Sequence, residues 1–149
     1  MPVANNMDEL RNMLTKELEI AMREVSDAAL ADMYDETGKF YTGRQPVKGG
    51  YKRTGALGNT PRVTTPKQLR TSRYTTEVSF DAYLDLSHDY TTGDRPGMEQ
   101  VLLLASYGIP WQTSSGAVAR STVGKRGFWQ RAENKIENDL YKVMRRHFR

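Results

Sequence analysis

The feature that most constrains the fold is an unbroken amphipathic segment from residue 6 to about residue 34. Asn6 is expected to cap a helix here, with Asp8 and Glu9 in the first turn, where the helix dipole favours acidic groups. Gly38 is expected to be the left-handed residue that ends the helix, which places the stop within residues 34–38. Apolar residues recur at steps of three and four and form one stripe of the helix: Met7, Leu10, Leu14, Leu18, Ala21, Val25 and Ala28.

Such a helix would be about 42 Å long, which is long for a chain of 149 residues. Two interpretations of the apolar stripe stay open. It is either the buried face of a core helix with one wet face, or it also packs on a neighbouring subunit.

A basic stretch follows this helix. Residues 37–76 carry nine Lys or Arg and no Asp or Glu, whereas residues 1–36 carry three basic and nine acidic residues. Residues 37–61 are also rich in Gly and Pro and predict a long loop. The two blocks either neutralise each other within one monomer or face separate partners, and a nucleic acid is another candidate partner. The cations expected to face a partner or DNA are Arg44, Lys48, Lys52, Arg53 and Arg62.

The second half of the chain predicts strands and then another helix. Strands are expected over about residues 62–85, and Pro66 interrupts the first of them. Residues 98–107 form a short apolar segment that periodicity leaves open between helix and strand, and residues 108–127 predict a loop. A helix is predicted over residues 128–147, with an apolar stripe of Trp129, Ala132, Ile136, Leu140 and Val143. This order predicts a single α+β domain, with two helices packed on a small antiparallel sheet.

The sequence predicts no enzyme, no cofactor and no metal site. His88 lies near Asp85 and Asp89, but their spacing along a strand and a loop does not bring metal ligands to one point. His147 ends a basic helix, where a solvated or C-capping role is expected. No apolar run approaches the length of a membrane span of about 18 residues. The absence of Cys excludes disulfides and cysteine ligands.

Two short motifs resemble those of a known family. Residues 53–57 contain the signature Thr-Gly-x-Leu, formed by Thr54, Gly55 and Leu57, and residues 127–129 read Gly-Phe-Trp before the last helix. Together with the order helix, loop, strands and helix, they resemble the small tail-completion or head–tail joining proteins of long-tailed bacteriophages. In the signature, the glycine would provide a turn and Leu57 would be an anchor in the core.

What the resemblance implies is a virion structural protein without catalytic residues, assembled in the host cytoplasm. Such proteins form a ring, commonly of six copies, between the head connector and the tail. The implied partners are neighbouring copies, the connector or head-closure protein, and the tail terminator or tube protein. DNA passing through the channel would be contacted without sequence preference. Acidic and basic blocks of adjacent subunits would face each other in a head-to-tail contact. The alternatives are a basic nucleic-acid-binding module and an adaptor of a bacterial complex unrelated to phage.

Overall fold

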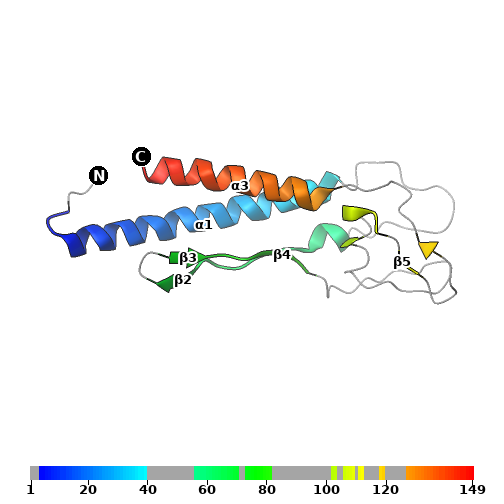
Figure 1. Ribbon diagram of the computed structural model, residues 1–149, viewed down its shortest axis with the longest axis horizontal. Coiled ribbons are helices and arrows are strands. Elements are labelled where there is room, and N and C mark those ends of the chain that lie inside the picture. Colours follow the sequence, from blue (N-terminus) through cyan, green and yellow to red (C-terminus); the bar gives the residue numbers. More distant parts are fainter. Residues whose placement is uncertain are drawn as a thin grey trace.

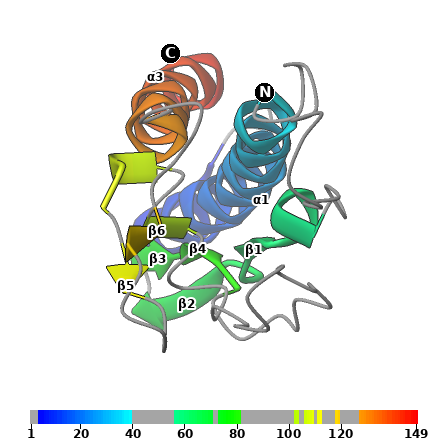
Figure 2. The same ribbon diagram turned by 90° about the vertical axis from the view of Figure 1, so that its right-hand side faces the viewer.

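Two long helices and three pairs of short antiparallel strands make up the protein. The computed structural model describes residues 4–39, 56–70, 73–81, 102–103, 106–109, 111–112, 118–119 and 127–149. Helix α1 is Met7–Lys39 and helix α3 is Phe128–His147. They run antiparallel side by side, and the strands lie along another side of α1 (Figures 1 and 2). The predicted α+β class is confirmed, and α3 has the predicted bounds.

Helix α1 begins where the sequence predicts it. The Asn6 Oδ1 accepts a hydrogen bond from the backbone N–H of Glu9 at 2.8 Å, and the Glu9 carboxylate accepts one from the backbone N–H of Asn5 at 2.7 Å. These reciprocal bonds are a variant of the capping box, in which two backbone donors at the helix start gain acceptors. The first turn is therefore fixed locally, by side chains within five residues of each other.

The predicted end of α1 is wrong, because the helix continues to Lys39. Gly38 lies within it and is not among the glycines with positive φ, which in the described part are Gly108 and Gly127. Two contacts hold the last turn. The Thr37 hydroxyl donates to the carbonyl oxygen of Met33 at 2.9 Å, and the buried Glu36 is paired with cations of α3. Residues 37–39 consequently belong to the helix and not to the predicted basic loop.

The predicted strand region is a long hairpin in two parts. The strands are β1 (Pro61–Val63), β2 (Lys67–Arg70), β3 (Arg73–Thr75) and β4 (Val78–Phe80). Strand β1 pairs with β4, with Pro61 opposite Phe80, and β2 pairs with β3 farther along the hairpin. Pro66 lies in the break between the two parts, as expected for a residue that lacks a backbone donor.

Three segments that the sequence left open or placed in loops have a definite structure. The 3-10 helix η1 (Ala56–Asn59) and the start of β1 both fall within the predicted loop of residues 37–61. The predicted loop of residues 108–127 contains β5 (Trp111–Gln112) and β6 (Val118–Ala119), which pair antiparallel. The apolar segment is helical where it is described, at residues 102–103 and 106–107.

The core between the helices is made of small side chains. Ala21 and Val25 of α1 pack against Val143 of α3, with Leu140 and Met144 partly buried beside them. At the other end, the rings of Phe80 in β4 and Phe128 in α3 meet edge to face, with centroids 5.2 Å apart. This is a favourable aromatic geometry. It joins the strand layer to the start of α3. In the described part of the chain, no helix is both long and apolar enough to cross a membrane.

The start of α3 depends on a left-handed glycine. Gly127 precedes the helix with φ of 58°, a backbone conformation in which a Cβ atom is strained. Its N–H donates to the carbonyl oxygen of Ser106 at 2.9 Å. The turn therefore ties the helical stretch at residues 106–107 to the first residue of α3.

Candidate assembly surface

Most of the predicted partner-facing cations lie outside the described residues. These are Arg44, Lys48, Lys52 and Arg53, together with Thr54 and Gly55 of the signature. The structure places the two remaining residues of the predicted site, Leu57 and Arg62.

Leu57 is an anchor in the core, as the signature predicts. Its side chain is 3% exposed, and it lies in η1 against α1. Its carbonyl oxygen accepts a hydrogen bond from the hydroxyl of Thr60 at 2.7 Å, and the Thr60 carbonyl oxygen accepts one from the N–H of Asp81 at 2.7 Å. Leu57 therefore fixes the entry into β1 and is not a contact residue for a partner.

Arg62 was predicted to face a partner; its side chain is 48% exposed, and its guanidinium is also hydrogen-bonded within the chain. The group donates to the carbonyl oxygens of Asn59 and Pro61, at 2.7 Å and 2.9 Å, and to the Asp81 carboxylate at 3.2 Å. These bonds lock the corner between η1 and β1 to the end of β4. The positive charge of Arg62 is therefore paired with the Asp81 carboxylate of the same chain.

The apolar stripe of α1 is divided into a covered half and a bare half. Ala21 and Val25 are buried under α3, whereas Met7 is 75% exposed and Leu14 is 49% exposed. The first turns of α1 extend past the end of α3 and past the β2–β3 tip (Figure 1). The sequence predicts which side of the helix is apolar, but not where along the helix its cover ends.

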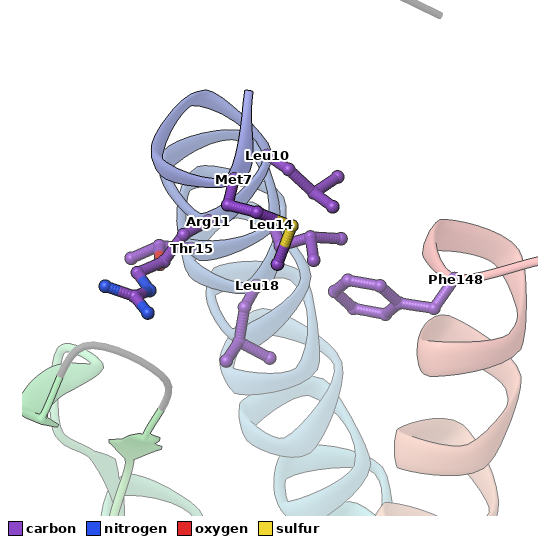
Figure 3. Close-up of a pocket in the computed structure, with 7 residues that line it drawn as sticks. All are labelled: Met7, Leu10, Arg11, Leu14, Thr15, Leu18 and Phe148. Carbon is purple, nitrogen blue, oxygen red and sulfur yellow. The ribbon is translucent and has the colours of Figure 1, made fainter. Parts of the chain in front are cut away.

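The bare half of the stripe lines a groove of about 390 Å³. Figure 3 shows the ring of Phe148 at the end of α3 pointing toward α1, level with Leu14 and Leu18. Arg11 and Thr15 lie on the side that faces the strand hairpin. We call this site the apolar groove; its lining residues are Met7, Leu10, Arg11, Leu14, Thr15, Leu18 and Phe148.

A group of ion pairs holds the end of α3 against α1 beside this groove. The two ring nitrogens of His147 face the carboxylates of Glu17 and Glu24, the latter at 2.9 Å, and Arg146 also pairs with Glu24. His147 is therefore neither solvated nor a helix cap, which corrects the prediction. The partner carboxylates are more than 120 positions away in the sequence, so no local pattern could have shown them.

A second group of ion pairs lies at the other end of the two helices. The carboxylate of Glu36, 1% exposed as a residue, accepts from Arg131 Nε at 2.6 Å and from the Nζ atoms of Lys135 and Lys39 at 2.7 Å each. Burial alone would raise the pKa of Glu36, but hydrogen bonds from Lys135, Lys39 and Arg131 lower it from 4.5 to about 2. Hydrogen bonds from Lys135 and Lys39 also lower the pKa of Asp35 to about 2.

These carboxylates keep their charge at neutral pH, and each pairs α1 with α3. The hydrogen bonds that Lys135 donates to Asp35 and Glu36 in turn raise the pKa of Lys135 above its usual value. The two helices are therefore fastened by ion pairs at both ends of a thin apolar seam. Among the described residues, no three His, Asp or Glu side chains gather as a metal site would require.

The comparisons with known proteins add no relative. No family model matches the chain, and neither a curated protein nor a solved structure is similar to it at a significant level.

Proposed function

We propose that this protein is a non-enzymatic virion component that joins the head and the tail of a phage as a ring-forming adaptor. The single observation that carries the assembly role is the apolar groove at the projecting end of α1. The phage context comes from the resemblance of the two sequence motifs. The connector or head-closure protein and the tail terminator or tube protein are the proposed partners at the two faces of the ring.

The length of α1 supports an assembly role. Its 33 residues extend for about 50 Å, whereas the 20 residues of α3 extend for about 30 Å. Because His147 near the end of α3 contacts Glu17, about 15 Å of α1 extends past this contact, and this part carries Met7, Leu10 and Leu14. Burying one large apolar side chain contributes about 1.5–3 kcal/mol. An apolar surface with a polar rim is typical of a protein–protein contact.

A neighbouring copy is the proposed occupant of the groove. When one surface of a subunit contacts a different surface of the next, a ring forms if the rotation between subunits closes, and an open filament forms if it does not. The projecting end of α1 offers one such surface. Repeating the contact six times would give the hexamer that the phage resemblance implies.

Two aliphatic residues of α1 provide a matched test. Leu14 lines the groove and is 49% exposed, whereas Ile20 is 46% exposed and does not line it. Leu14→Glu would bury an unpaired carboxylate in the contact at a cost of about 3 kcal/mol or more. Each contact would then weaken by a factor of roughly 100 or more. We expect light scattering over a concentration series to show multimers for the unchanged protein and for Ile20→Glu, but monomers for Leu14→Glu.

The joining role itself is tested in the virus. A phage that encodes Leu14→Glu should accumulate filled heads and separate tails in negative-stain electron micrographs, whereas Ile20→Glu should give complete particles. Equal loss of assembly in both variants, or complete particles in both, would refute the role of the groove. An unchanged protein that stays monomeric at every concentration would refute ring formation by the protein alone.

A further inference from the structure

The β2–β3 end of the long hairpin gathers three exposed cations. They are Lys67 and Arg70 in β2 and Arg73 in β3, and all four residues of β2 are exposed. No carboxylate pairs with any of the three within the described part of the chain. Other cations are used internally: Arg62 pairs with Asp81 and Arg131 with Glu36. Unpaired cations also occur elsewhere in the described part, at Lys16 on α1 and at Arg145 and Arg149 at the end of α3. The hairpin tip is distinguished by holding three of them within two paired strands.

Two of these cations stand directly opposite each other. Arg70 and Arg73 are partners in the β2–β3 register. Like charges at opposed positions of an antiparallel pair destabilise it. Such a pair does not stabilise the fold. An anion bound between or beside the two guanidinium groups would reduce their repulsion. Arginine is also suited to this, since its planar group binds phosphate with two parallel hydrogen bonds.

An acidic surface of a second copy is the competing occupant of this tip. Asp35 and Glu36 pair with cations of α3, Glu24 pairs with Arg146, and Asp81 pairs with Arg62. The exposed acids without a cation partner in the described part are Asp27, Glu77, Glu133 and Glu137. A second copy therefore also offers acids, and the choice of occupant rests on the opposed arginines, whose geometry suits phosphate.

We infer that the β2–β3 hairpin binds the phosphate backbone of duplex DNA, without sequence preference, through Lys67, Arg70 and Arg73. A two-stranded β-ribbon is narrow enough to enter or lie along the major groove. Contacts to phosphate position a protein on the duplex but carry no base information directly. The inference is independent of the groove on α1, so it stands or falls separately from the proposed ring.

The test compares two triple variants of the full chain that lose the same charge. Lys67→Gln, Arg70→Gln and Arg73→Gln remove the hairpin cations. Lys16→Gln, Arg145→Gln and Arg149→Gln remove exposed cations of α1 and of the end of α3, and serve as the matched control. Binding to two labelled duplexes of unrelated sequence is measured by fluorescence anisotropy at several salt concentrations. Thermal unfolding of each variant, followed by circular dichroism, checks that the fold is retained.

Each phosphate contact contributes about 0.9 to the slope of log K against log salt. The hairpin variant should therefore have a slope shallower by about 2.7, and at about 0.1 M salt its affinity should fall by roughly 100-fold or more. The slope of the control variant should differ from that of the unchanged protein by no more than about one phosphate contact. The two duplexes should bind with equal affinity.

Three results would overturn the inference. The first is no binding of DNA by the unchanged protein at low salt. The second is an equal loss of slope in the hairpin and control variants, which would mean that overall charge and not the hairpin attracts DNA. The third is unchanged DNA binding with loss of multimers in the hairpin variant. That result would instead assign the tip to an acidic surface of another copy, such as Glu133 and Glu137.

Discussion

Replacing Glu36 by Gln tests whether ion pairs, rather than apolar packing, fasten α1 to α3. The pKa of Glu36 is lowered from 4.5 to about 2, and one pKa unit corresponds to about 1.36 kcal/mol. The charged carboxylate therefore stabilises the fold by about 3 kcal/mol. Arg131 and Lys135 are 46% and 36% exposed, so water can solvate them once the carboxylate is lost. The cost should thus lie at the low end of the range for breaking a buried pair, about 3–5 kcal/mol.

The effect depends on pH in a defined direction. The folded pKa of Glu36 is below the unfolded value, so its contribution is complete above about pH 5 and is lost as the pH falls toward about 2. At about pH 3, the contribution should have fallen to about 1.4 kcal/mol.

Urea unfolding followed by far-ultraviolet circular dichroism measures this difference directly. We expect Glu36→Gln to lower the free energy of unfolding by about 3 kcal/mol near pH 7. The difference in free energy of unfolding between Glu36→Gln and the unchanged protein should decrease as the pH falls. Glu133→Gln, at an exposed position of α3, is the control and should stay within about 0.5 kcal/mol. A gap below about 1 kcal/mol near pH 7, or one that does not change with pH, would refute the reasoning.

Four further substitutions have expected effects on thermal or urea unfolding. Leu57→Ala should destabilise by about 2–5 kcal/mol, because Leu57 is 3% exposed and its removal leaves a cavity; a change below about 1 kcal/mol would contradict its role as an anchor. Gly38→Ala should stabilise α1 by about 0.5–1 kcal/mol, since nothing lies within 4 Å of the added Cβ. Gly127→Ala should instead destabilise by about 1–2 kcal/mol, because φ is 58° there, and opposite signs at the two glycines are the diagnostic result. Arg73→Glu should stabilise the hairpin by about 0.2–1 kcal/mol by replacing its repulsion with Arg70 by attraction, and a loss of stability would show that the two arginines do not repel.

Local signals in the sequence were reliable where the structure is also determined locally. The start of α1 follows from Asn6 and Glu9, which bond to backbone groups beside them. The bounds of α3 follow from its apolar stripe. The class α+β follows from the order of these elements. Leu57 was identified as a core residue by the signature.

The predictions failed where contacts between residues far apart in the sequence determine the structure. Helix α1 passes Gly38 because Glu36 is paired with Arg131, which lies 95 positions away. The bonds of Arg62 within the chain were also missed, because Asp81 lies 19 positions away and is brought close by the pairing of β1 with β4. The groove was not predicted, since periodicity gives the direction of a stripe and not the extent of its cover. None of these contacts produces a recognisable pattern of residues at short spacing in the sequence.

The unbroken course of α1 makes its first turns a short projecting arm. The ion pairs of Glu17 and Glu24 hold α1 against the end of α3, so the arm is the part from Met7 to Glu17, about 15 Å long. A tilt of about 5° at Glu17 would carry Met7 through about 1.3 Å. A rearrangement of the contacts around His147 would therefore shift the apolar side chains of the arm, and with them whatever the tip holds.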